Sequence, residues 1–356
     1  MFSWERIVGT NNLEDQSGIA GMGKKGRYVL LKKVAAIALR LSVSIALLLW
    51  IIRSIDLGVL EKVIISPRVY ALVIMVILSI FVVFLGGVKL WVLFRGFSSL
   101  NIWLFTGYFF LAGSIGSLIP AIFGDFTLVA LVRRDKVHMH QSVSALLLDR
   151  FSTLLMAGFL FTPFTLAFLL PVKPWTVFIL TIMALAGFCI LMIIIARFAP
   201  LLFSRIPAAQ RFWESLMLFF SNYRRNLLAN VLIGLGRSII SGVALAFAFM
   251  AADLRPPLFP TICITSSLSV ITHIPISLSG LGVYEGTGLI LFEAIGMGRE
   301  QVLAGLLYQR LYIIIWATLS IVIVGFIVLL HRSRRSINLP DGSVPLKSQG
   351  SNHDPF

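Results

Sequence analysis

The sequence predicts an all-α polytopic membrane protein with six full transmembrane helices and two re-entrant helical hairpins, arranged as an inverted repeat. The chain is 58% hydrophobic and only 13% charged, whereas soluble domains carry about 25% charged residues. Several apolar runs exceed the roughly 20 residues that a helix needs to cross the hydrocarbon core. Two further apolar regions are interrupted by proline and glycine, and these interruptions predict the hairpins.

Six apolar runs are long enough to span a bilayer: 34–52, 69–94, 143–170, 175–196, 227–250 and 302–330. If the N-terminus is cytoplasmic, the inner loops hold 19 Lys and Arg residues and the outer loops hold 6. Cytoplasmic loops are enriched in basic residues, so this distribution predicts that both termini are cytoplasmic. We therefore expect a basic N-terminal tail (1–33), a transmembrane domain (34–331) and a C-terminal tail (332–356). The same rule accounts for the net charge of +15, and we expect no nucleic acid partner.

The two interrupted regions are 100–132 and 258–297, and each carries a carboxylate beside its break. The break residues are Pro120 and Gly124 in the first region, and Pro275, Gly280, Gly282 and Gly286 in the second. The apolar segment after each break would cover only about 18–20 Å, so each region should enter and leave on one side of the membrane. Interrupted backbone is tolerated in a bilayer only where it is buried in protein or lines a wet cavity. Paired breaks of this kind are typical of a transport site.

An internal repeat follows the two hairpins. The segment Gln141–Arg150 aligns without gaps to Gln301–Arg310 and shares its Gln, two Leu and terminal Arg. The predicted topology makes the two copies run in opposite directions, as in the inverted repeats of alternating-access carriers. Arg150 and Arg310 then lie about 13 Å deep from opposite faces, near the middle of a core about 30 Å thick.

The residues around the breaks resemble a known family. Pro120, Gly124 and Asp125, then Asp149-Arg150, then Pro275 and the segment Gly280-Leu-Gly-Val-Tyr-Glu-Gly286 resemble the transmembrane region of lysylphosphatidylglycerol synthases, over about residues 35–330. The resemblance implies a stand-alone flippase-like protein of a bacterial or archaeal cytoplasmic membrane. Relatives are associated with aminoacylated phosphatidylglycerol, hopanoid-type lipids or polyprenyl-linked sugars. Only about 25 polar residues follow the last span, so we do not expect the lipid-aminoacylating activity in this chain.

The chain departs from the family pattern at four places. Asp125 stands where Glu is usual, Tyr284 where Arg is common, Thr153 where an acid often follows the Asp-Arg pair, and Ser279-Gly280 where a double glycine is found. Because these differences alter the charge of the site, the resemblance does not carry a cargo lipid over to this chain.

Arg150 and Arg310 are the first candidate site residues. A charge deep in a span costs at least about 2.5–3.5 kcal/mol, so it faces a partner or a cavity. Arginine binds phosphate through two parallel hydrogen bonds, so the two guanidinium groups could hold a lipid phosphate. The alternative is that they form structural ion pairs with Asp149, Asp125 or Glu285 that brace the hairpins.

Further candidates have two interpretations each. Asp125 and Glu285 could hold a head-group amine or couple transport to protons, or they could cap helix N-termini. Arg237, in Gly234-Leu-Gly-Arg-Ser238, is either a site residue or a brace between closely packed helices. Lys89 lies nearer the end of its span, so we expect it to extend toward the membrane interface. The basic, aromatic-rich segment 197–226 is predicted to lie at the inner interface.

The favoured function is translocation of a phosphate-containing phospholipid or other polar lipid between leaflets. The formal charges of Arg150, Arg237, Arg310, Asp125, Asp149 and Glu285 cancel, which suits a zwitterionic or mixed-charge head group. The alternatives are an intramembrane enzyme that acts on lipid-linked phosphates and an accessory subunit of a separate lipid-synthesising enzyme. We expect no metal or other cofactor, because the sequence contains no metal-ligand cluster and no ATP-binding phosphate loop. Gly and Ala pairs on the spans permit close helix contacts, either within one chain or between the chains of an oligomer.

Overall fold

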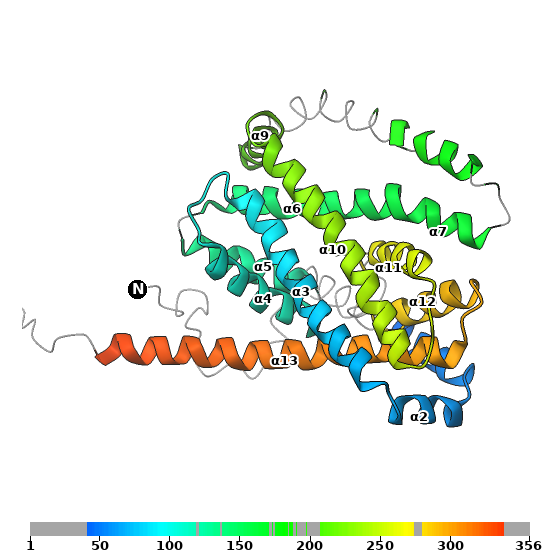
Figure 1. Ribbon diagram of the computed structural model, residues 1–356. Helices are drawn as coiled ribbons and strands as arrows, with labels where there is room; N and C mark the ends of the chain where they lie inside the picture. The colour runs from blue at the N-terminus through cyan, green and yellow to red at the C-terminus, as the bar shows by residue number, and fades with distance from the viewer. Residues whose placement is uncertain are drawn as a thin grey trace, which may run out of the picture.

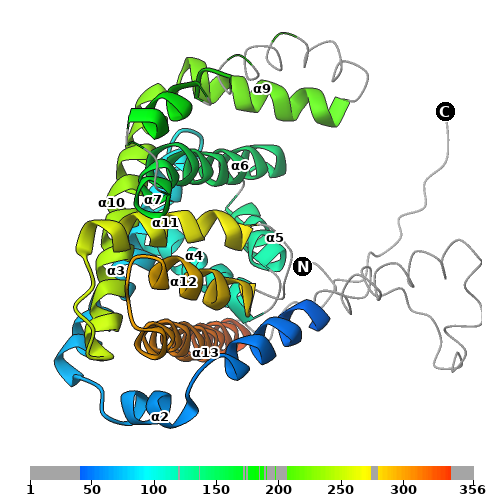
Figure 2. The ribbon, with the colours of Figure 1, turned by 90° about the vertical axis from the view of Figure 1, so that its right-hand side faces the viewer.

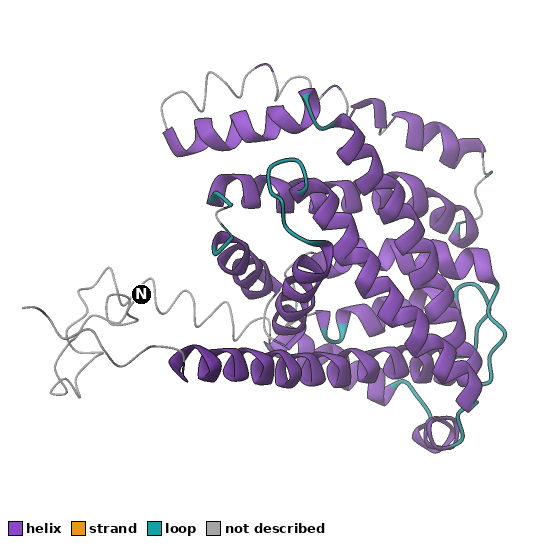
Figure 3. Cartoon of the chain, turned by 60° about the vertical axis from the view of Figure 1, so that its left-hand side comes forward, coloured by secondary structure: helices purple, strands orange, loops and turns teal. Residues whose placement is uncertain are grey.

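The computed structural model is helical in all of its regular elements and contains no strand among the residues that it describes (Figure 3). Those residues are 41–118, 121–135, 137–170, 173, 175–183, 185–187, 190, 197, 207–273 and 280–337. The predicted all-helical class is therefore confirmed for this part of the chain. The predicted N-terminal tail (1–33) and the break residues Pro120 and Pro275 lie outside the described residues. Of the predicted C-terminal tail (332–356), residues 332–337 continue the last helix, Arg299–Ile337, and the rest lies outside the described residues.

The helices follow one another along the chain as Figure 1 labels them. Their bounds are α2 Leu57–Ile65, α3 Val69–Phe94, α4 Ile102–Leu118, α5 Ala121–Arg133, α6 Met139–Leu155, the π-helical segment η2 Met156–Phe161, α7 Thr162–Leu169, α9 Pro207–Ser221, α10 Arg224–Ala251, α11 Leu258–His273, α12 Val283–Glu293 and α13 Arg299–Ile337. A further helix at Leu41–Arg53 precedes α2.

Four helices are long and apolar enough to cross a membrane: Val69–Phe94, Met139–Leu169, Arg224–Ala251 and Arg299–Val322. They correspond to four of the six predicted spans. Large apolar side chains such as Val69, Val73 and Ile77 are exposed along α3, and an apolar surface of this kind is suited to lipid rather than water. The chain is therefore an integral helical membrane protein.

The helix that corresponds to the predicted span 34–52 is followed by a sharp bend and a second helix, which the sequence did not predict. The helix Leu41–Arg53 and α2 are bent by 93°, and together they would count as a fifth span. Asp56 causes α2 to start as a separate helix, because its carboxylate accepts hydrogen bonds from the N–H groups of Gly58 and Val59 at 2.8 and 3.2 Å. Of the predicted span 175–196, the structure describes a short apolar helix at Trp175–Gly187.

Helices α3 and α10 form an antiparallel pair that runs diagonally across Figure 1. At one end the N–H of Arg68 donates to the carbonyl of Ala251 at 3.1 Å. Toward the other end the Asn230 side chain donates to the carbonyl of Lys89 at 2.9 Å. Gly234 permits this close packing, because a Cβ there would lie 2.8 Å from Cε of Lys89.

The helices on either side of each break pack against each other as hairpins, α4 with α5 and α11 with α12. In the first hairpin, a Cβ on Gly124 would lie 2.5 Å from the carbonyl oxygen of Ala112 and 3.0 Å from Cα of Gly116. In the second, Gly280 and Gly282 adopt φ angles of 76° and 80°, which glycine adopts without steric cost. Thus the glycines predicted at the breaks have two roles, close helix contact in one hairpin and a left-handed turn in the other.

Each hairpin lies in its own hydrophobic core, and Figure 2 shows α11 and α12 between α7 and α13. One core joins α4 and α5 to the end of α3 and to α6, through Phe94, Phe105, Leu128, Ala145 and neighbours. The other joins α11 and α12 to the end of α10 and to α13, through Phe249, Leu268, Phe292, Leu306 and neighbours. The chain order within the two cores is the same: a long helix, a hairpin and a second long helix.

The span Met139–Leu169 is interrupted by the π-helical segment η2, which is followed by Pro163 at the start of α7. Proline lacks an N–H and its ring crowds the carbonyl four residues earlier. One wider turn accommodates this crowding, so the helix continues without a break.

We predict that Gly124→Ala destabilises the protein whereas Gly286→Ala does not. The added methyl group at 124 would overlap the α4 backbone, and overpacking costs about 1–3 kcal/mol. At 286 the nearest atom to a new Cβ is 3.7 Å away, which is ordinary contact. In detergent, the Gly124→Ala substitution should lower the apparent Tm, measured by thermal unfolding, by roughly 2–6 °C. An unchanged Tm for Gly124→Ala would contradict the close α4–α5 contact.

Candidate functional site

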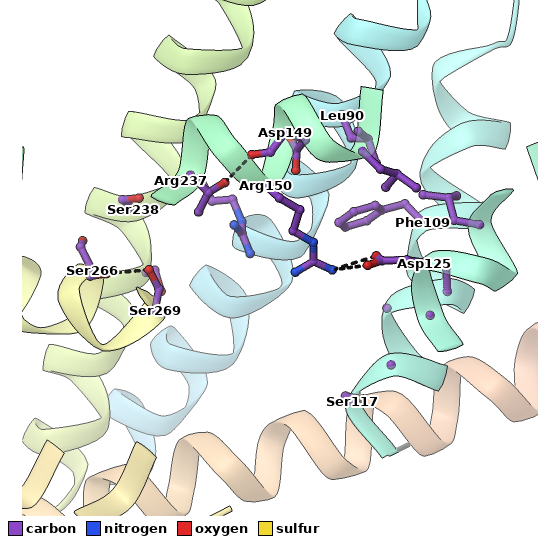
Figure 4. A pocket seen from close by; sticks show the side chains of 18 of the residues that line it. Leu90, Phe109, Ser117, Asp125, Asp149, Arg150, Arg237, Ser238, Ser266 and Ser269 are labelled. Atoms are coloured by element: carbon purple, nitrogen blue, oxygen red, sulfur yellow. Dashed lines mark hydrogen bonds and ion pairs between the residues drawn. The ribbon is translucent and has the colours of Figure 1, made fainter. Parts of the chain in front are cut away.

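A polar cavity of about 400 Å³ lies between the first hairpin, α6, α10 and α11 (Figure 4). Four charged residues of the predicted site line it: Asp125, Asp149, Arg150 and Arg237. The rest of the lining consists of small or hydroxyl-bearing residues and a few apolar ones, including Ser117, Ser238, Thr265, Ser266 and Phe109. The structure thus brings together side chains that are more than 100 residues apart in the sequence.

Arg150 on α6 forms an ion pair with Asp125 on α5. Its Nη2 atom donates to both carboxylate oxygens, at 2.8 and 3.0 Å, as Figure 4 shows. The two side chains are 38% and 39% exposed. The pair therefore connects the first hairpin to the following span while remaining accessible from the cavity.

Arg310 on α13 forms the corresponding pair with Glu285 on α12. Its Nη2 and Nε atoms lie 2.7 and 2.8 Å from Oε1 of Glu285. The other carboxylate oxygen accepts the N–H of Gly282 at 2.8 Å. Glu285 therefore caps the N-terminus of α12 and binds Arg310, so both structural interpretations of this carboxylate apply together. The Glu285 and Arg310 side chains are only 3% and 18% exposed.

The two ion pairs occupy equivalent places in the chain. In each, the acid lies in the second helix of a hairpin and the arginine lies 25 residues later in the next long helix. They differ in accessibility, since the first pair faces the large cavity and the second is nearly enclosed.

Lys89 contradicts the prediction that it extends to the membrane interface. Its side chain is 1% exposed, and Nζ lies 2.9 Å from the Asp149 carboxylate and 2.6 Å from the Thr153 hydroxyl. Asn230 on α10 also donates to Asp149, at 2.9 Å. The reason is that Lys89 occupies the face of α3 that packs against α6 and α10, where Gly234 leaves room for its methylenes. The adjacent Gly86-Gly87 pair was the sequence signal for a tightly packed rather than lipid-facing position.

Arg237 is placed differently from the other basic residues of the site. Its Nε donates to the carbonyl of Val82 at 3.3 Å, and the described residues provide it with no ion pair. In Figure 4 its guanidinium group and that of Arg150 point toward the same open region. Arg237 therefore presents its remaining N–H donors to the cavity.

A second cavity of about 200 Å³ adjoins the first and is lined by Tyr284, Gln309 and Arg310. Ser241, Thr265 and Ser269 line both cavities. The guanidinium of Arg310 also lies 6.0 Å from the ring centre of Tyr284, within the range of a cation–π contact. A row of hydroxyl groups thus links the environments of the two hairpin ion pairs.

No cluster of His, Cys, Asp or Glu suited to a metal ion occurs among the described residues. Of the predicted break residues, Gly124 lines the large cavity and Gly282 provides the turn before α12. Gly286 has only loose contacts with Trp50 and Ile51.

The fold and site define an integral membrane protein whose apolar helices enclose a polar, ion-paired interior. The sequence profile of the lysylphosphatidylglycerol synthase TM region matches residues 37–322, so the chain belongs to this family. The membership confirms the resemblance predicted from the break motifs. It indicates a membrane protein related to lipid modification or to flippase function. No curated protein and no solved structure is significantly similar to the chain.

We predict that Lys89→Met and Asp149→Asn each destabilise the protein strongly, because removing one partner leaves the other as an uncompensated buried charge. The expected cost is about 3–5 kcal/mol for either change. The double variant should be more stable than the sum of the two losses implies. The measurement is the apparent Tm of all four proteins in the same detergent. A Lys89→Met variant as stable as the parent would show that the lysine carries no charge that needs a partner.

Proposed function

We propose that this protein moves a phosphate-containing polar lipid between the leaflets of a bacterial or archaeal cytoplasmic membrane. The observation that carries the proposal is Arg237, a guanidinium group that lines a polar cavity within membrane-spanning helices and has no ion pair among the described residues. A cation in such a place is costly unless an anion compensates it. A lipid phosphate is an anion that is abundant in membranes and fits the donor geometry of arginine.

We further propose that the two halves of the chain form an inverted repeat around this site, with six spans and both termini in the cytoplasm. The antiparallel α3–α10 pair, the matching order of helices around each hairpin and the equal spacing of the two ion pairs support this arrangement. In it, the first hairpin enters from the cytoplasmic face and the second from the outer face.

The unequal exposure of the two ion pairs suggests how access would alternate. The Asp125–Arg150 pair is accessible and the Glu285–Arg310 pair is nearly enclosed. In the proposed cycle, the two pairs exchange these environments as the hairpins move. The head group then crosses along the hydroxyl row of Ser241, Thr265 and Ser269, while its acyl chains remain in lipid.

We expect the purified protein in liposomes to exchange acyl-labelled phospholipid between leaflets, and Arg237→Gln to slow that exchange about tenfold or more, because a charge-assisted hydrogen bond to phosphate is lost. Fluorescence quenching from the outer side measures the exchange. Arg95→Gln is the matched control, since Arg95 is exposed at the end of α3 and outside the cavity. Absence of exchange by the parent protein, or chemical change of the lipid without exchange, would contradict the proposed function.

The proposed topology predicts which ends of the hairpins face each side. In a background with Cys189 and Cys263 replaced by alanine, Ser99→Cys and Asp135→Cys should react with a membrane-impermeant thiol reagent only from the cytoplasmic side. Arg255→Cys and Ala294→Cys should react only from the outer side. All four positions are exposed. Labelling of Ser99→Cys and Asp135→Cys from opposite sides would mean that the first hairpin spans the membrane instead of re-entering.

A further inference from the structure

We infer that the head group accepted by this site is anionic and rich in hydroxyl groups and carries no cationic amine: a phosphodiester lipid with a polyol or sugar head group. The inference rests on the proposed transport function and specifies its substrate class. It differs from the zwitterionic or mixed-charge head group that the neutral sum of the six predicted site residues suggested. The argument depends on which charges of the site are already compensated by the protein.

The first step is the charge balance around the large cavity. Arg150 is paired with Asp125, and Lys89 is paired with Asp149. Arg237 is the third cation at this site, and the described residues provide no third carboxylate. Because Lys89 uses the charge of Asp149, the site carries a net positive charge that the sequence-based set, which omitted Lys89, did not have.

The second step is that the smaller cavity does not cancel this excess. Its cation, Arg310, is paired with Glu285, so this half of the site is neutral. The site as a whole therefore carries one more cation than carboxylates. A ligand with a single negative charge would neutralise it, whereas a head group with extra ammonium charge would increase the repulsion.

The third step concerns acceptors for an ammonium group. Both oxygens of Asp125 accept from Arg150, and one oxygen of Asp149 accepts from both Lys89 and Asn230. Glu285 has one oxygen on Arg310 and the other on a backbone N–H. Every carboxylate of the site is thus engaged by a protein cation, so an amine would have to share a carboxylate whose charge is already compensated.

The fourth step is the position of Arg237. Its Nε is fixed on the carbonyl of Val82, beside Gly86. A Cβ on Gly86 would lie 3.3 Å from this Nε atom, so the absence of a side chain leaves room for the guanidinium group against α3. Held in this way, the Nη atoms face the cavity from the same side as Arg150 (Figure 4). Two adjacent guanidinium groups form a local positive region suited to one phosphate.

The last step is the chemistry of the hydroxyl lining. Thr265 and Ser266 each donate their hydroxyl hydrogen to a backbone carbonyl one turn earlier, at 2.6 and 2.8 Å. Their oxygens therefore present acceptor lone pairs to the cavity. Uncharged donors such as the hydroxyl groups of glycerol or a sugar match these acceptors. The large cavity is within the usual size range of small-molecule sites.

The test compares three lipids that carry the same fluorescent acyl chain: phosphatidylglycerol, phosphatidylethanolamine and lysylphosphatidylglycerol. Leaflet exchange is measured with the full-length purified protein in liposomes of neutral carrier lipid. We expect phosphatidylglycerol to exchange about tenfold faster than the lysyl lipid. Phosphatidylethanolamine should fall between them, because it combines the phosphate with one amine.

A change in site charge should move this preference. Thr153→Asp places an additional carboxylate beside Lys89 and the cavity, so the ratio of phosphatidylglycerol to lysyl-lipid exchange should fall several-fold. Thr153→Asn has the same shape without the charge and should retain the parental ratio. Ser241→Asp and Ser241→Asn provide a second matched pair on the lining of both cavities, in case the substitution at 153 prevents folding.

The outcomes separate this inference from the proposed function. If none of the three lipids exchanges, the proposed function is wrong. If lipids exchange but the lysyl lipid is as fast as or faster than phosphatidylglycerol, transport stands and the anionic substrate class is overturned. The same conclusion follows if the folded Asp variants keep the parental ratio.

Discussion

The structure depends on one constraint: each positive charge buried between apolar helices needs a negative charge close by. Three cations are neutralised in this way, in the ion pairs Lys89–Asp149, Arg150–Asp125 and Arg310–Glu285. Each joins two different helices, so electrostatic compensation also determines how the hairpins sit against the spans. Burying a pair is not in itself strongly stabilising, but breaking one leaves an isolated charge in a medium that solvates it poorly. The pairs therefore act chiefly to exclude other arrangements of the same helices.

The polar cavity follows from this arrangement. Glycines allow the helices to approach where the pairs form, notably Gly124 in the first hairpin and Gly234 beside Lys89. On α10 and α11 the residues that face this region are small serines and threonines, and the two adjoining cavities lie beside them. Among the described residues that line the two cavities, Arg237 is the cation without an ion pair. Its position connects the architecture to the proposed chemistry, in which a lipid phosphate compensates the charge of Arg237.

The sequence predicted those features that have a local physical cause. Proline and glycine located both hairpins, and the rule that buried charge needs a partner identified Arg150, Arg310, Asp125 and Glu285. The sequence could not show which carboxylate pairs with which arginine, because the pairing depends on packing between helices that are distant in the chain. Lys89 was misjudged for the same reason: its depth in the span was visible, but the face of α3 that it occupies was not. The bend at Asp56 also escaped prediction, since a single capping residue within a mostly apolar segment is a weak signal.

The most direct test of the central claim is an experimental structure of the protein in a bilayer nanodisc that contains phosphatidylglycerol. The account predicts lipid phosphate within hydrogen-bond distance of the Arg237 guanidinium, about 2.7–3.2 Å, with the three ion pairs intact or exchanged in exposure between the hairpins. A structure in which Arg237 is paired with a protein carboxylate, and no head group enters the cavity, would contradict it.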